Sequence, residues 1–105
     1  MTWPAIPTLI RGAGGPIKVR CVKHVRPEGV ECWGVWNDAT RTIRLDKTAL
    51  IEHQWRVLFH ELAHAAIGDA GIENLFDEQG VETLCDALAT ARIQELRGQL
   101  GIMDA

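Results

Sequence analysis

Residues 55–67 read WRVLFHELAHAAI, and the interpretation of the whole chain starts from this stretch. At its centre is the motif H-E-x-x-H, formed by His60, Glu61 and His64. On a helix, residues four apart are offset by only about 40°, so both imidazoles project from one face, one turn apart. Two neutral imidazoles at this spacing can bind one zinc ion, and Glu61 is placed to take a proton from a metal-bound water. The motif therefore predicts a helical zinc site with Glu61 as the catalytic base.

The apolar pattern around the motif independently predicts a helix over residues 49–67. Apolar side chains recur at the spacing of a buried helical stripe, at Ile51, Trp55, Leu58, Leu62 and Ala65. Asp46 or Thr48 is expected to cap the start of this helix, and Gly68 is expected to mark its end. A second helix is expected over residues 77–97, with an apolar face made of Val81, Leu84, Leu88, Ala91 and Leu96.

Three strands are expected before the motif helix, within residues 17–46. Alternating patterns over 17–25 and 40–45, and a run rich in Val and Trp over 30–36, predict strands separated by turns at 27–29 and 37–39. Short connections favour an antiparallel meander, and the strand at 40–45 is the candidate edge for adding a substrate peptide. Trp33 and Trp36 are expected in the core or on a sheet face. Residues 1–16, with three of the four prolines, are expected to form an extended arm.

These elements predict an α+β fold in one domain spanning residues 1–105, with a small three-stranded antiparallel or mixed sheet packed on the motif helix and a second, C-terminal helix. The net charge is −3 and no basic run is present, so nucleic-acid binding by this domain is not expected. No signal peptide and no apolar stretch of about 20 residues is found, which predicts a cytoplasmic protein without a membrane contact. Three scattered cysteines fit reduced, buried thiols.

A catalytic zinc site usually has three protein ligands, so one more must come from elsewhere in the chain. No histidine follows the motif, and positions 67 and 70 hold Ile and Ala where metzincins have Gly and His. The second helix offers Glu78, Glu82 and Asp86, spaced four apart on one face. We expect Glu82 as the ligand and Asp86 as the carboxylate that orients a ligand histidine. One alternative is that Glu78 is the ligand and Glu82 supports it from behind. A second alternative is that the three carboxylates form a solvated acidic face.

The chain resembles a known family at this point. His60-Glu61-Leu62-Ala63-His64, followed after a loop by residues 82–89 (ETLCDALA), is similar to the ImmA/IrrE-type minimal metallopeptidases of bacteria, phages and mobile elements. Their pattern is H-E-x-x-H, then E-x-x-A-(N/D)-x-F-A on the next helix. The match covers roughly residues 34–97, with Cys85 replacing Ala and Leu88 replacing Phe. Within these 105 residues we expect neither the helix-turn-helix domain nor the C-terminal sensor domain of the larger members.

The resemblance implies a zincin-like fold of the gluzincin kind, one zinc ion per chain, and hydrolysis of peptide bonds in a protein or peptide substrate. Many enzymes of this type stabilise the oxyanion with a Tyr or a His. This chain has no Tyr, which leaves His24 and His53 as candidate helpers. The alternative function is a catalytically silent zinc-binding module that acts in interaction or regulation. A third interpretation is that His60 and His64 are merely packed.

Overall fold

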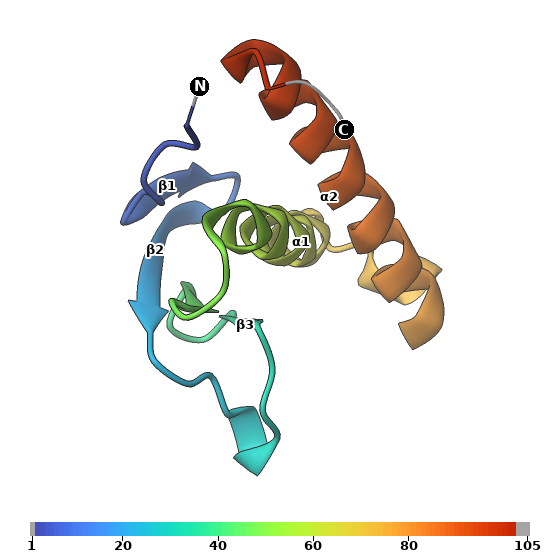
Figure 1. Cartoon of the computed structure of the whole chain (residues 1–105). Coiled ribbons are helices and arrows are strands. Elements are labelled where there is room, and N and C mark those ends of the chain that lie inside the picture. The colour runs from blue at the N-terminus through green and yellow to red at the C-terminus, as the bar shows by residue number, and fades with distance from the viewer. Residues whose placement is uncertain (1, 103–105) are drawn as a thin grey trace.

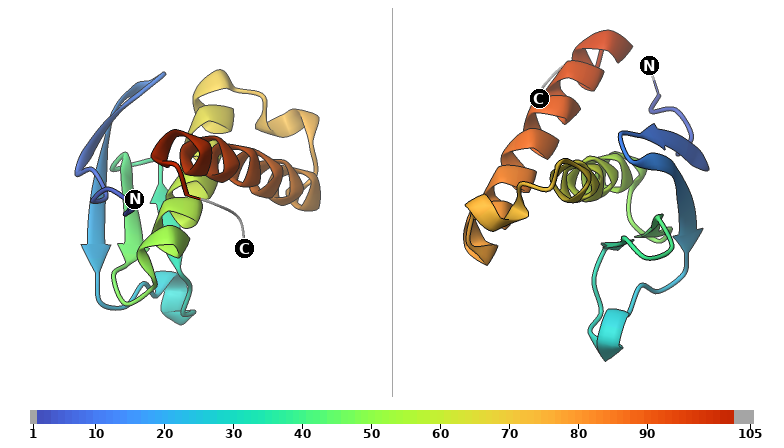
Figure 2. Two further views of the ribbon diagram at one scale, coloured as in Figure 1. Left: turned by 45° about the horizontal axis from the view of Figure 1, so that its top comes forward. Right: turned by 180° about the vertical axis from the view of Figure 1, so that it is seen from behind.

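The computed structural model describes residues 2–102, which form two layers of helix on one mixed sheet. The elements follow in the order β1 (Leu9–Gly12), β2 (Gly15–Val22), the 3-10 turn η1 (Pro27–Gly29), β3 (Gly34–Asn37), β4 (Thr42–Asp46), α1 (Ile51–Ala70), the 3-10 turn η2 (Glu73–Leu75) and α2 (Glu78–Leu100). In Figure 1, α1 is seen end-on, with the sheet on one side and α2 on the other. The views in Figure 2 show the same order of layers, sheet, α1 and α2. The predicted α+β class is confirmed, with a fourth strand that was not expected.

The sheet has the strand order β1-β2-β4-β3, so the expected antiparallel meander is wrong. β2 pairs with β4 in parallel, whereas the β1–β2 and β3–β4 pairs are antiparallel. The long connection over residues 23–33 leads the chain away from β2 and back, held by an isolated bridge between Val25 and Cys32. This connection is too long for a hairpin, so β3 pairs with β4 alone. The strand expected over residues 40–45 is therefore central, and β1 and β3 are the edge strands.

The expected extended arm is wrong in its second half, because residues 9–12 form β1. The register pairs Leu9 with Lys18 and Gly12 with Gly15, which places a tight turn at residues 13 and 14. Gly15 has φ of 132°, a conformation that glycine adopts without steric cost. The first half of the arm is tied to α1, because the indole N–H of Trp55 donates to the Pro4 carbonyl over 2.8 Å.

α1 runs past its predicted end. Gly68 lies inside the helix, and Gly71, with φ of 68°, ends it in the left-handed conformation. The expected side-chain cap is also wrong: Leu50 occupies the N-cap, while Asp46 Oδ1 accepts hydrogen bonds from the backbone N–H and the hydroxyl of Thr48. The short Asp46 side chain thus shapes the turn before the helix instead of closing the helix itself.

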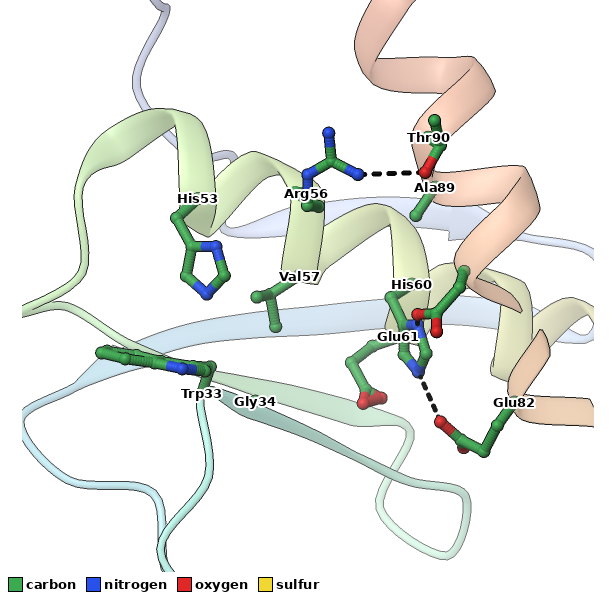
Figure 3. Close-up of a pocket in the computed structure, with 11 residues that line it drawn as sticks. Trp33, Gly34, His53, Arg56, Val57, His60, Glu61, Glu82, Ala89 and Thr90 are labelled. Atoms are coloured by element: carbon green, nitrogen blue, oxygen red, sulfur yellow. Dashed lines mark hydrogen bonds and ion pairs between the residues drawn. The ribbon is translucent and has the colours of Figure 1, made fainter. Parts of the chain in front are cut away.

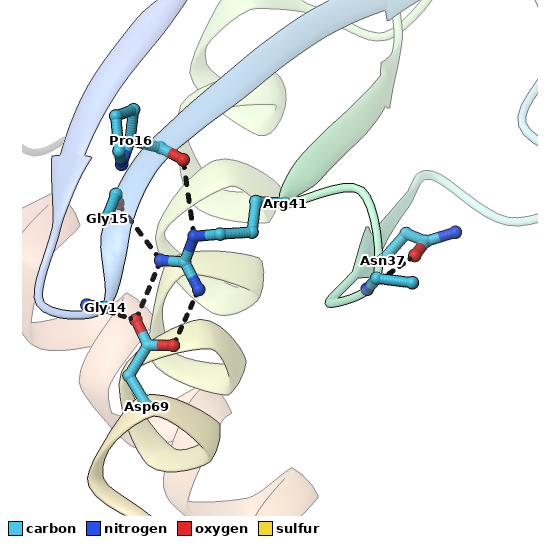
Figure 4. Close-up of polar contacts among 7 residues, drawn as sticks. Gly14, Gly15, Pro16, Asn37, Arg41 and Asp69 are labelled. Carbon is cyan, nitrogen blue, oxygen red and sulfur yellow. Dashed lines mark hydrogen bonds and ion pairs between the residues drawn. The ribbon is translucent and has the colours of Figure 1, made fainter.

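The extra turn brings Asp69 to the end of the β1–β2 hairpin. Its carboxylate accepts two hydrogen bonds from the Arg41 guanidinium, over 2.8 and 2.9 Å, and one from the Gly14 N–H over 2.9 Å. Arg41 also donates to the carbonyls of Gly15 and Pro16 (Figure 4). Two hydrogen bonds lower the pKa of Asp69: the one from Arg41 has the larger effect, and the one from the Gly14 N–H adds to it. This cluster joins the hairpin, the β3–β4 turn and the end of α1.

α2 begins where the sequence predicts, because the Asp77 carboxylate caps it by accepting from the Gly80 N–H over 2.6 Å. Its buried face is shifted from the expected one. Cys85, Ala89 and Ile93 are buried, whereas Leu88 is 45% exposed. Small side chains at positions 85 and 89 let the helix pack closely on α1. The predicted apolar face rested mainly on large aliphatic residues and did not include these two positions.

α1 is the shared element of the core and is buried on two sides. Leu58 and Ala65 pack with the sheet residues Ile43 and Leu45, while Phe59 packs with Ala89 on α2. All three cysteines are free thiols, but only Cys85 is buried, and Cys21 is exposed. Among the described residues, neither helix is sufficiently long and apolar to cross a membrane.

Candidate metal centre

His60 and His64 present their Nε2 atoms to the same point between α1 and α2. The two Nε2 atoms are 3.2 Å apart, and the ring centroids are 4.9 Å apart. Both side chains are largely buried, with 18% and 24% of their surfaces exposed. The one-turn spacing predicted from the motif is thus realised with both nitrogens turned toward each other.

Glu82 on α2 supplies a carboxylate directly opposite the two imidazoles. Its Oε1 lies 2.7 Å from His64 Nε2, and its Oε2 lies 3.2 Å from His60 Nε2. Figure 3 shows Glu82 reaching from α2 toward His60 on α1. A tetrahedral ion with bonds of about 2.05 Å separates its ligand atoms by about 3.3 Å. The separation of 3.2 Å between the two Nε2 atoms matches this spacing, while each Glu82 oxygen lies next to a different imidazole.

Asp86 lies on the opposite side of the His60 ring. Its Oδ1 is 2.8 Å from His60 Nδ1. A carboxylate at this position favours a proton on Nδ1, which leaves Nε2 with a lone pair directed at Glu82 and His64. Nε2 of His60 then faces the Glu82 carboxylate and Nε2 of His64, and a cation between these three side chains would have a ligand atom from each. The donor set of two imidazole nitrogens and one carboxylate is one that suits zinc.

Glu61 lies beside this cluster and is almost fully buried. The residue is 8% exposed. A carboxylate oxygen of Glu61 and one imidazole nitrogen each of His60 and His64 all lie within 4.8 Å of one another. Burial raises the pKa of Glu61, an effect that the two histidines oppose and Glu82 reinforces. A buried carboxylate with a raised pKa next to a candidate metal site is suited to accepting and returning a proton.

A cavity of about 580 Å³ opens beside the centre (Figure 3). His60, Glu61, Glu82 and Asp86 line one part of it. The rest of its wall comes from three other segments: Trp33 and Gly34 at the start of β3, the first half of α1, and Ala89 and Thr90 on α2. The cavity therefore gives the candidate centre a space in which a ligand could lie.

The remaining candidates from the sequence have different positions. Glu78, the alternative ligand, is exposed in the first turn of α2, and among residues 2–102 neither histidine contacts it. His24 contacts Glu31 over 3.4 Å and forms a separate group with Glu31 and Asp46, outside the cavity. His53 does line the cavity, with its ring against Trp33 at a centroid distance of 5.1 Å.

Sequence reasoning did not assign several residues of the cavity wall to the site, among them Trp33, Arg56 and Thr90. Trp33 was expected in the core or on a sheet face, but it is 52% exposed at the base of the 23–33 connection. Arg56 is one helical turn before His60, and Thr90 is one turn after Asp86. Those spacings were present in the sequence as a signal, since both residues extend the faces that carry the site.

A scan of protein-family models, a search of curated proteins and a search of solved structures each found no match to this chain.

Proposed function

We propose that this protein is a zinc metallopeptidase of zincin-like fold that hydrolyses peptide bonds. The observation that supports this most is the convergence of His60, His64 and Glu82, whose ligand atoms lie 2.7 to 3.2 Å apart. His60, His64 and Glu82 would hold one zinc ion per chain, and Asp86 would orient His60. Bound zinc supplies Lewis acidity and lowers the pKa of a coordinated water to about 7.

In this proposal Glu61 moves the proton. Its buried carboxylate accepts a proton from the attacking water and returns it to the leaving amine nitrogen. His53 is the one candidate oxyanion helper that lines the cavity, since His24 lies outside it.

The substrate backbone is proposed to pair with β3. This strand has β4 on one side and a free edge on the other, and its first residue, Gly34, lines the cavity. An extended peptide added to that edge would run beside the candidate centre. β4 cannot serve, because β2 and β3 occupy both of its edges.

A catalytically silent zinc-binding module is the second candidate. It is favoured by the scarcity of oxyanion donors, because the chain has no Tyr and His24 is turned toward Glu31. Such a module would keep the metal ligands and use zinc to stabilise the contact between α1 and α2.

The two functions are separated by comparing the zinc-loaded wild type with Glu61→Gln. Zinc content is measured by elemental analysis, and cleavage is followed with a denatured, fluorescently labelled protein and a peptide library. For a peptidase we expect one zinc in both proteins and cleavage by the wild type alone, with Glu78→Gln as a matched control that retains both properties. Zinc in both proteins with cleavage by neither would favour the silent module, and absence of zinc would contradict both functions.

A further inference from the structure

The cavity beside the candidate centre is divided by charge. Its acidic side chains, Glu61, Glu82 and Asp86, all lie beside His60. The other end is lined by Arg56, His53 and Trp33 instead (Figure 3). A ligand that spans both ends therefore meets a cationic and aromatic wall beyond the centre.

Arg56 and Thr90 form a cross-helix contact one turn away from the contact between His60 and Asp86. An Arg56 guanidinium N–H donates to the Thr90 hydroxyl over 3.0 Å, which holds the guanidinium at the cavity. In the described part of the chain no carboxylate pairs with Arg56, and the Thr90 hydroxyl is its one hydrogen-bond acceptor. A guanidinium carries five N–H donors in a rigid fork that matches a carboxylate, so most of its donors are open to a ligand.

A second polar group in the same wall lacks a partner. The Nε2 atom of His53 is fully buried, and it has no hydrogen-bond partner among the described residues. The Trp33 ring packs edge-on against the His53 ring, at an interplanar angle of 83°. Buried polar atoms are rarely left unpaired in a protein interior, and among the described residues Nε2 of His53 is the one such atom in this wall.

We propose that Arg56 selects substrates that carry a carboxylate side chain next to the scissile bond. This inference rests on the proposed peptidase function and specifies its substrate class. The turn between Arg56 and His60 rises about 6 Å along α1. Arg56 is thus one turn away from the candidate centre, and a glutamate side chain, one methylene longer than aspartate, reaches farther toward it. The like charge of Asp86 lies against His60, which lessens its repulsion of such a substrate.

The test uses hydroxamates, which bind active-site zinc without being cleaved. Acetohydroxamate and peptide hydroxamates with Glu, Gln or Lys next to the hydroxamate are titrated calorimetrically into the zinc-loaded full chain. We expect the Glu probe to bind about tenfold more tightly than the Gln probe at low salt, and the Lys probe to bind most weakly. The Glu preference should shrink in about 1 M NaCl, which screens an exposed charge contact.

Arg56→Gln should abolish the difference between the Glu and Gln probes, and Arg56→Lys should retain part of it because the charge remains. Arg20→Gln, an exposed arginine on β2, is the control and should leave the preference unchanged. Equal binding of the Glu and Gln probes by the wild type, with acetohydroxamate still bound, would overturn the role of Arg56 and leave the proposed function standing. Loss of acetohydroxamate binding in Arg56→Gln would also overturn it, because the effect would then lie on the metal centre. Failure of the wild type to bind acetohydroxamate would overturn the proposed function itself.

Discussion

Asp86→Asn should weaken zinc binding without removing a ligand. The Asp86 carboxylate lies 2.8 Å from His60 Nδ1, on the side of the ring away from Glu82. Asparagine has the same shape and still offers an oxygen to Nδ1, but it lacks the negative charge that makes the imidazole a stronger donor to a cation. The substitution therefore isolates the electrostatic part of this contact.

The size of the effect follows from the exposure of Asp86. Replacing a carboxylate that supports a ligand histidine typically costs about 10- to 100-fold in metal affinity. The Asp86 side chain is 75% exposed, so water screens its charge and the loss should fall at the lower limit. We expect the Kd for zinc to rise about tenfold, which corresponds to about 1.4 kcal/mol.

A competition titration against a fluorescent zinc chelator measures this change. Glu82→Gln should raise the Kd further than Asp86→Asn, because it weakens a direct ligand, whereas Glu78→Gln should leave it unchanged. Thermal unfolding in excess chelator checks that all three variants fold without metal. A change of less than about twofold in Asp86→Asn would refute the reasoning, since the charge would then have no measurable effect on the histidine. A larger loss in Glu78→Gln than in Glu82→Gln would refute the choice of ligand.

Three further predictions concern the scaffold of the site. Asp69→Asn should lower the melting temperature at neutral pH, because it removes the ion pair with Arg41. The native pKa of Asp69 is depressed, so the carboxylate stabilises the fold above the unfolded pKa of about 3.9. The difference in melting temperature between the variant and the wild type should therefore close as the pH falls below that value. Gly34→Ala should cost about 1–3 kcal/mol in urea unfolding, because the new Cβ would overlap Val57 Cγ1, and Val57→Ala in the same chain should recover much of that loss. Leu58→Ala should cost about 2–5 kcal/mol in the same assay, since Leu58 is fully buried between α1 and the sheet; a loss under about 1 kcal/mol would contradict that core assignment.

The geometry of the candidate centre was predictable because most of it is local. His60 and His64 share a helix, and the helical period alone places their side chains together. Glu82 and Asp86 likewise share a helix, so one packing contact between α1 and α2 brings both carboxylates to the histidines. The sequence left Glu78 open as the ligand because it lies on the same face one turn earlier. Choosing between Glu78 and Glu82 required the relative position of the two helices, which no spacing within α2 specifies.

The order of the strands was not predictable from the same patterns. Alternation of apolar residues over 40–45 identifies a strand, but the pattern is the same whether that strand has one neighbour or two. The parallel pairing of β2 with β4 depends on the connection over residues 23–33, whose bridge between Val25 and Cys32 is a contact within a loop. The pairing of β1 was hidden by the prolines and glycines around it, which favour turns locally, although Ile10 packs against the core.

This difference has a consequence for the proposed specificity. The centre uses two helices, but the cavity wall around Arg56 needs three segments, because Trp33 reaches it only through the 23–33 connection and the edge position of β3. Arg56 and Thr90 are fixed by the same helix packing that fixes His60 and Asp86, so a change that separates α1 from α2 should weaken metal binding and carboxylate selection together. A change confined to the 23–33 connection should instead move Trp33 and leave His60 and His64 in place. We therefore expect variation in the 23–33 connection to alter the part of the cavity wall that Trp33 forms, while His60, His64 and Glu82 keep their positions.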